Sequence, residues 1–151
     1  GIRDHCVTGV QTCALPISLI LGVDLKKDSR RLHDAYNDAA GITAQFTLNL
    51  LRRMNRELDG SFDLAAFAHE AFYNPSESRI EIYLRSLLNQ TVSVSGRRFA
   101  FEKGELVHTE YSYKYDSASL AALAARGGFA VDRTWTDAEG LFAVAWLKAS
   151  A

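Results

Sequence analysis

The sequence has little net charge, few cysteines and no long apolar run. Its 17 Lys and Arg residues nearly balance its 18 Asp and Glu residues, which leaves a formal net charge of −1. A balanced chain offers no polybasic face for nucleic acid or anionic lipid, and no segment approaches the roughly 20 apolar residues of a membrane-spanning helix. We therefore expect no nucleic-acid partner and no membrane partner. With 48% apolar residues over a length of 151, the composition predicts one globular domain or part of a larger one.

Both cysteines, Cys6 and Cys13, lie in an N-terminal segment that differs in character from the rest of the chain. Residues 7–17 match the in-frame translation of a common short-read sequencing adapter, and polar residues interrupt any signal-peptide centre. We therefore interpret residues 1–18 as a non-native, adapter-derived segment fused to a truncated gene; a genuine but unusual N-terminus is the alternative. Without them the chain has no cysteine, which excludes a disulfide framework, a thiolate metal site and a cysteine nucleophile. Such a chain fits a cytoplasmic location.

Hydrophobic patterning predicts a strand and then helices in the first half of the remaining chain. Residues 19–26 form an apolar run that ends in acidic and basic residues, which is typical of a buried parallel strand. Helical patterns follow over residues 28–40, 44–58 and 62–69. In the second of these the apolar residues recur at steps of three and four, so we expect them to face the core. These residues are Phe46, Leu50, Leu51, Met54 and Leu58.

The second half changes to extended segments and then returns to a helix. Alternating or β-branched segments predict an antiparallel meander, with strands at residues 70–74, 79–88, 90–95, 98–102 and 106–110. Residues 117–126 have helical periodicity, and two apolar runs at 129–135 and 141–147 predict a β-hairpin. The order of elements predicts an α/β fold in which a mixed sheet is interrupted by an inserted α+β module.

The segment His108–Tyr115 is the most informative for chemistry. In an extended chain residues two apart share a face, so Glu110, Ser112 and Lys114 are expected on one side. The three intervening tyrosines, Tyr111 among them, then lie on the other side. A carboxylate beside a hydroxyl suits a neutral imidazole, because Glu110 accepts the ring N–H and Ser112 donates to the other nitrogen. The alternative is an edge strand with ordinary polar and aromatic surface residues.

Tyr36 is a second candidate, because it precedes a glycine break and follows the strand whose carboxyl end opens toward ligands. It could hold a substrate carboxylate or amine, or it could be a half-buried tyrosine at a helix end. His108 and Glu110 are the only pair with metal-ligand character that the alternation places on one face. We do not predict a metal site, because three or more convergent ligands are normally required.

Several blocks together resemble a known family. They occur in order at residues 22–28 (GVDLKKD), 35–46 (AYNDAAGITAQF), 55–58 (NREL), 72–74 (FYN), 78–81 (SRIE) and 108–114 (HTEYSYK). The chain from Leu19 onward resembles the C-terminal part of the histidine-specific, S-adenosylmethionine-dependent methyltransferases. The resemblance implies trimethylation of the α-amine of L-histidine to hercynine, the first step of ergothioneine synthesis.

The family fold implied by this resemblance is a Rossmann-like methyltransferase domain with an inserted substrate-binding domain. Residues 19–26 would be a strand of the methyltransferase sheet, residues 27–115 the histidine-binding domain, and residues 116–151 the final helix and β-hairpin. The N-terminal half of the sheet would be missing. The glycine-rich loop and the acidic residue that hold S-adenosylmethionine in this family would precede Leu19, so no cofactor-binding residue is expected here and the fragment alone should be inactive.

The resemblance also assigns roles to individual side chains. Tyr36 resembles the tyrosine that helps to hold the amino-acid end of the substrate, and Glu110 with Ser112 resembles the pair that grips the imidazole. Tyr111 lies between that pair and would contribute through its backbone. No residue is assigned as the proton acceptor for the amine, and no metal is expected. The alternatives are a methyltransferase for another amino acid or amine, and a non-catalytic ligand-binding module.

Overall fold

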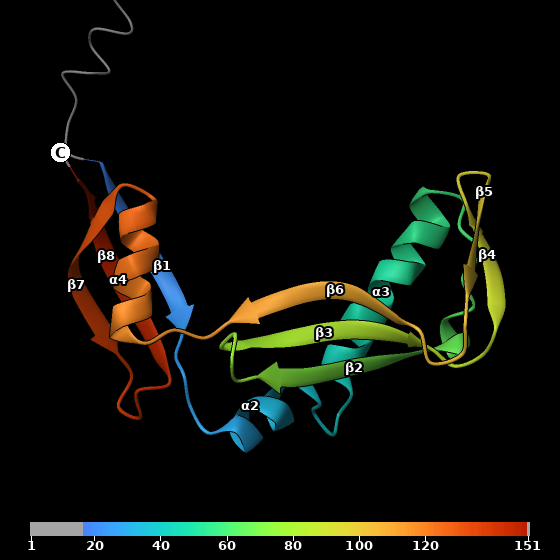
Figure 1. The fold of residues 1–151 in the computed structure, drawn as a ribbon, viewed down its shortest axis with the longest axis horizontal. Helices are drawn as coiled ribbons and strands as arrows, with labels where there is room; N and C mark the ends of the chain where they lie inside the picture. Colours follow the sequence, from blue (N-terminus) through green and yellow to red (C-terminus); the bar gives the residue numbers. More distant parts are fainter. Residues whose placement is uncertain (1–16, 151) are drawn as a thin grey trace, which may run out of the picture. The chain divides into compact units, whose positions relative to one another are not determined.

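The computed structural model describes residues 17–150, so the interpretation of residues 1–16 lies outside the described part of the chain. The described chain divides into two units (Figure 1). The terminal unit combines the described residues up to Lys26 with those from Lys114 onward, and the central unit comprises residues 27–113. Each unit has its own secondary structure and its own hydrophobic core. Among the described residues, no helix has the length and apolar character needed to span a membrane.

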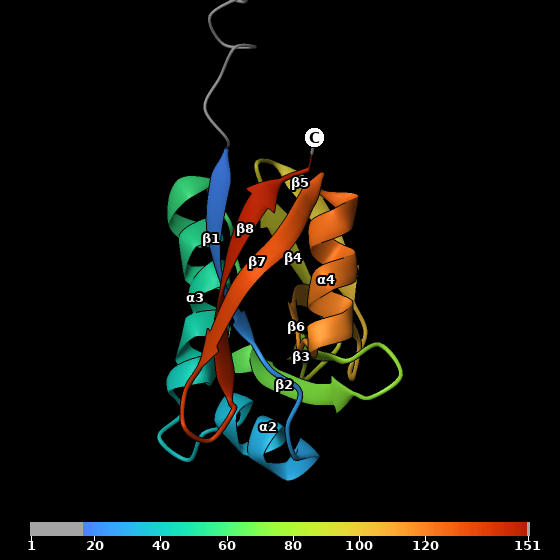
Figure 2. The same ribbon diagram turned by 90° about the vertical axis from the view of Figure 1, so that its left-hand side faces the viewer.

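The terminal unit is a three-stranded antiparallel sheet with one helix. The strand order is β1 (Ser18–Asp24), β8 (Phe142–Ala149) and β7 (Phe129–Thr136), with α4 (Ser117–Arg126) lying along β7 (Figure 2). The expected helix and hairpin are therefore confirmed. Asp137 closes the hairpin, because its carboxylate accepts the N–H groups of Leu141 and Phe142. The core is formed by Val23, Leu120, Ala124, Ala143, Ala145 and Leu147.

The first strand differs from its prediction in direction and burial. The described partner of β1 is β8, which runs antiparallel to it, whereas a parallel and fully buried strand was expected. A buried strand needs a neighbour along both edges, and β1 has one only along its β8 edge within the described residues. Leu19 and Ile20 are consequently 42% and 73% exposed. The strand begins at Ser18, the last residue of the segment interpreted as adapter-derived.

The central unit packs two helices against one face of a sheet. The helices are α2 (Ser29–Tyr36) and α3 (Ile42–Glu57), and a short 3-10 turn, η1 (Leu64–Ala66), leads into the sheet. The strands are β2 (Phe67–Asn74), β3 (Arg79–Ser86), β4 (Gln90–Val94), β5 (Arg97–Phe101) and β6 (Leu106–Tyr113). Strands β2, β3 and β6 form one antiparallel sheet, and β4 pairs with β5 in another. The coarse expectation of a mixed α and β chain is confirmed.

Two details of this unit correct the sequence predictions. The strands do not form one continuous meander, because β3 pairs directly with β6 and the β4–β5 hairpin leaves the sheet between them. Ser86 marks the exit: it is fully buried, its N–H donates to the carbonyl of Glu105, and its hydroxyl donates to that of Leu88. The helix expected over residues 62–69 is a 3-10 turn, since Phe67 already pairs with Ser86 as the first residue of β2.

The helix-free face of the main sheet contains a buried carboxylate with several donors. Glu81 is 6% exposed and accepts hydrogen bonds from Asn74 (3.0 Å), Arg79 (2.9 Å) and the Tyr83 hydroxyl (2.7 Å). Donation by Tyr83, followed by Arg79, lowers the pKa of Glu81, and the same contact raises the pKa of Tyr83 to about 12. The charged carboxylate and the protonated phenol are therefore the forms that stabilise this face of the sheet.

Replacement of Glu81 by glutamine should lower stability at neutral pH, and this difference from the parent chain should shrink in acid. The folded-state pKa of Glu81 lies below its unfolded value of about 4.3, so its contribution is present above that value and disappears as the pH falls through the folded pKa. Urea unfolding of the 151-residue chain at pH 7, 5 and 3 measures this. Glu102→Gln, at an exposed site, is the matched control. An equal deficit for Glu81→Gln at all three pH values would contradict the assignment.

Candidate functional site

The structure brings Tyr36, Glu110 and Ser112 together on the helix-covered face of the main sheet. The hydroxyl oxygens of Tyr36 and Ser112 are 2.7 Å apart and form a hydrogen bond in which either hydroxyl can be the donor. Glu110 lies opposite Ile82 on β3, and Ser112 lies opposite Ile80, so both point toward the same face. A pocket of about 280 Å³ is lined by Tyr36, Ile42, Thr43, Phe46, Ile82 and Glu110. Tyr36 and Glu110 therefore line one pocket, and Ser112 is joined to Tyr36 by a hydrogen bond.

A β-bulge in β6 determines which residues face this pocket. The register passes from Tyr83 opposite His108 to Ile82 opposite Glu110, so Thr109 is an extra residue with no residue of β3 directly opposite it. The Thr109 hydroxyl donates to the carbonyl of Ile82 at 3.0 Å. The bulge reverses the alternation, and His108 therefore lies beside Tyr111, with ring centroids 3.9 Å apart. The interpretation of His108 and Glu110 as a same-face pair is wrong for this reason.

The remaining residues of the predicted segment have separate environments. The Tyr111 ring lies 3.8 Å from the Arg79 guanidinium, on the face opposite Tyr36. Lys114 was expected beside Glu110 and Ser112, but β6 ends at Tyr113 and Lys114 belongs to the terminal unit. There its ammonium group lies 2.9 Å from the carboxylate of Asp24, and the residue is 1% exposed. Of the three polar residues expected on one face, only Glu110 and Ser112 therefore lie together on β6.

Glu110 itself is exposed, and its carboxylate makes no hydrogen bond or ion pair with the residues that the structure describes. It lines both the pocket beside Tyr36 and a second pocket of about 230 Å³ that Asn49, Arg53 and Thr109 help to line. A carboxylate with free lone pairs at the wall of a pocket is an acceptor for an N–H or ammonium group of a small molecule.

The loop between the two helices is fixed by polar contacts that the sequence analysis did not identify. Asp38 accepts the N–H groups of Ile42 (2.8 Å) and Thr43 (2.9 Å), so its carboxylate caps the start of α3. Hydrogen bonds from the Thr43 hydroxyl and these two amides lower the pKa of Asp38 to about 2. Gly41 supports the same turn with a φ of 68°, which favours glycine. The turn holds the end of α2, and hence Tyr36, beside the start of α3.

The apolar row of α3 is less buried than its periodicity predicts. Leu51 is buried, but Phe46, Leu50 and Leu58 are 72%, 42% and 48% exposed. Phe46 lines both pockets beside Glu110, so an aromatic ring is available at the site. Helical spacing assigned this residue to the core, and only the position of β6 shows that it borders a pocket.

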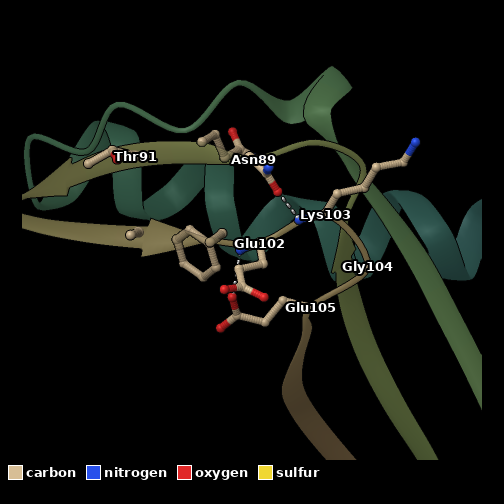
Figure 3. Close-up of a pocket in the computed structure, with 9 residues that line it drawn as sticks. Asn89, Thr91, Glu102, Lys103, Gly104 and Glu105 are labelled. Carbon is tan, nitrogen blue, oxygen red and sulfur yellow. Dashed lines mark hydrogen bonds between the residues drawn. The ribbon is translucent and has the colours of Figure 1, made fainter.

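A third hollow lies at the open end of the β4–β5 hairpin, where β4 begins and β5 ends. None of the predicted site residues lines it (Figure 3). Asn89 accepts the N–H of Lys103 at 2.7 Å, and Glu105 accepts the N–H of Glu102 at 2.8 Å, so these polar side chains organise the loop itself. Among residues 17–150, no three His, Cys, Asp or Glu side chains converge as metal ligands would.

Comparison with protein families gives the class of the chain, which is that of the S-adenosylmethionine-dependent methyltransferases. The family model described as histidine-specific methyltransferase, SAM-dependent, matches residues 4–149. The chain belongs to this histidine-specific family. The resemblance found in the sequence blocks is thereby confirmed.

Individual relatives agree with this assignment. The chain is 45% identical over 127 residues to the histidine N-alpha-methyltransferase of Mycolicibacterium smegmatis, covering 83% of this chain and 40% of the relative. Identity to the protein of the same name from Mycobacterium tuberculosis is 44% with the same coverage. Ergothioneine biosynthesis protein 1 of Neurospora crassa is 33% identical over 72 residues, covering 38% of this chain and 8% of that protein. The chain therefore spans about 40% of the length of the first two relatives.

Proposed function

We propose that residues 27–113 bind L-histidine in an enzyme that methylates the α-amino group of this substrate to give hercynine, the first step of ergothioneine biosynthesis. The observation that carries the proposal is that Glu110 and Tyr36 line one pocket while Ser112, on the same face of β6 as Glu110, is hydrogen-bonded to Tyr36. Family membership supports the reaction, and the relatives' printed names support the substrate. Residues 19–26 and 116–151 would then belong to a Rossmann-like methyltransferase domain whose N-terminal half lies outside this chain.

The two residues from β6 have the spacing that an imidazole needs. Residues two apart in a strand are separated by roughly 6.6 Å, so their side chains can approach the two nitrogens of one ring from different sides. Glu110 would accept the ring N–H, and Ser112 would donate its hydroxyl hydrogen to the other nitrogen. The neutral tautomer of histidine offers one donor and one acceptor, and this pair matches both.

The amino-acid end of the substrate would lie toward Tyr36. The Tyr36 hydroxyl is within hydrogen-bond distance of Ser112, so a molecule held by Ser112 also comes within reach of this phenol. Tyr111 would contribute through its backbone, because its ring is occupied by Arg79 on the other face. Methyl transfer requires the free amine, whose pKa is about 7.7–8.0 in an unperturbed α-amino group. These residues bind and orient that amine, and positioning of this kind is a large share of catalysis.

The pocket that the terminal unit offers is too small for the methyl donor. The pocket formed by Leu25, Asp116 and their neighbours in the terminal unit has a volume of about 120 Å³, below the roughly 300 Å³ at which sites for larger ligands begin. We therefore assign S-adenosylmethionine to residues outside this chain and derive no step from the residues present here. The exposed edge of β1, with Leu19 and Ile20, is where the remaining strands of such a domain would pair.

A chimera tests the proposal. In it, residues 19–150 of this chain replace the corresponding C-terminal part of the Mycolicibacterium smegmatis relative. We expect the chimera to convert L-histidine to its mono-, di- and trimethylated forms, measured by mass spectrometry, and to leave other amino acids and simple amines unchanged. The isolated 151-residue chain should show no binding of S-adenosylmethionine by calorimetry.

Three other outcomes would contradict parts of this proposal. Methylation of a different amino acid or amine by the folded chimera would favour the alternative substrate class. A folded chimera that binds both ligands without methyl transfer would favour a non-catalytic binding module. Micromolar binding of S-adenosylmethionine to the isolated chain would contradict the assignment of the cofactor to residues outside it.

A further inference from the structure

His69 connects the two helices that border the candidate site. It lies on β2, and its Nε2 atom is 2.8 Å from the backbone carbonyl oxygen of Tyr36. Its Nδ1 atom is 3.1 Å from the hydroxyl of Thr47, a residue of α3 that is 6% exposed. One imidazole therefore contacts the last residue of α2 and the second turn of α3.

The direction of the first hydrogen bond follows from chemistry. A carbonyl oxygen only accepts, so Nε2 must carry a hydrogen and donate it to Tyr36. This carbonyl belongs to the last turn of α2, where the backbone carbonyl oxygens have no N–H donor within the helix. His69 thus supplies the missing donor. The neighbouring residue Asn37 acts in parallel, because its side-chain amide donates to the carbonyls of His33 and Ala71.

Tyr36 is held both at its backbone carbonyl and at its phenol oxygen. Its backbone is held by His69, and its phenol oxygen lies 2.7 Å from the Ser112 hydroxyl. A helix end without a partner for its carbonyls frays readily, and displacement of the Tyr36 backbone would carry the phenol away from Ser112. His69 does not line the pocket, so its influence on a ligand must pass through Tyr36.

We infer that His69 is a positioning residue of the histidine site, which it serves by fixing the last turn of α2 so that Tyr36 reaches the substrate. This inference rests on the proposed function. It predicts that the Nε2–H donor, rather than the volume of the imidazole, is what matters. Glutamine can place an amide donor near the Nε2 position, whereas leucine fills similar space without one.

The kinetic test uses the chimera defined above. We expect His69→Leu to raise KM for L-histidine about 5- to 10-fold, the effect of one neutral hydrogen bond, and to leave S-adenosylmethionine affinity unchanged. His69→Gln should restore most of the loss. His33→Leu is the matched control, because this histidine is exposed on α2 and its side chain has Asp34 as its polar partner among the described residues. An unchanged KM in His69→Leu, or no recovery in His69→Gln, would overturn the inference.

A double-substitution cycle separates positioning from general loss of structure. If His69 acts through Tyr36, then His69→Leu should have little further effect on KM when Tyr36 is already phenylalanine. Fully additive effects would overturn the inference, since they would mean that His69 acts by a route independent of the Tyr36 hydroxyl. Thermal unfolding of all variants identifies any that fail to fold. Where a chimera variant fails to fold, the measurement below is made in the 151-residue chain, and only variants that stay folded are compared.

A second readout needs no enzymatic activity. In the 151-residue chain with ¹³C-labelled tyrosine, the Tyr36 ring resonance should shift in His69→Leu, stay near its parent position in His69→Gln, and not move in His33→Leu. An unmoved Tyr36 resonance in His69→Leu would overturn the inference. If the parent chimera fails to methylate histidine, the proposed function fails, and this spectroscopic comparison still decides whether His69 positions Tyr36.

Discussion

Replacement of Glu110 by alanine in the chimera should reduce histidine recognition by about 2–4 kcal/mol, or roughly 30- to 1000-fold in kcat/KM. The ring N–H of the substrate would lose its acceptor, and no other carboxylate lines the pocket beside Tyr36 among the described residues. Glu110→Gln should fall between the parent and Glu110→Ala, because its amide oxygen still accepts a hydrogen bond but carries no charge.

The control for this experiment is Glu102→Ala. Glu102 is also exposed, but it lies at the end of the β4–β5 hairpin and does not line the pocket beside Tyr36. Its kinetics should match those of the parent, and the affinity for S-adenosylmethionine should be the same in all three variants. A Glu110→Ala chimera with the parent's KM and kcat for histidine would remove Glu110 from the site.

Truncation of the core beneath the site should have the largest effect on folding. Ile80 is fully buried and packs with Leu32, Ala71 and Ile82 between α2 and the main sheet. Ile80→Ala should lower the free energy of unfolding by about 2–5 kcal/mol, since it removes buried methyl groups and leaves a cavity. Urea unfolding of the 151-residue chain measures this change.

Ile42→Ala is the matched substitution, because Ile42 is 64% exposed at the start of α3. Its effect on the free energy of unfolding should stay within about 0.5 kcal/mol, as for other exposed positions. Equal destabilisation by the two variants would show that the packing around Ile80 does not carry the stability of the central unit.

Local patterns predicted much of the fold. The β7–β8 hairpin and α4 follow from contiguous periodicity, which depends on nearby residues alone. The shared face of Glu110 and Ser112 follows from strand alternation, which holds because no irregularity lies between them. The adjacency of Tyr36 was accessible only through the family resemblance, since its partner Ser112 is 76 positions away.

The features that the sequence patterns did not predict depend on contacts between distant segments. No pattern within residues 106–115 reveals the bulge at Thr109, because it depends on the pairing partner β3. The early exit of β4 and β5 depends in the same way on Ser86 and its hydrogen bond with Glu105. No pattern in the sequence indicates the role of His69, since only the folded arrangement brings it to the carbonyl of Tyr36. In each case the decisive contact joins segments far apart in the chain.

The extra residue in β6 allows the strand to place a core side chain and a pocket side chain on the same face of the sheet. Val107 lies opposite Leu84 and packs into the apolar core, whereas Glu110, three positions later, faces the pocket on that same side. In an uninterrupted strand an odd spacing would place these two side chains on opposite sides. Removing the bulge while keeping the chain length would therefore either expose the Val107 side chain to water or turn the Glu110 carboxylate away from the pocket.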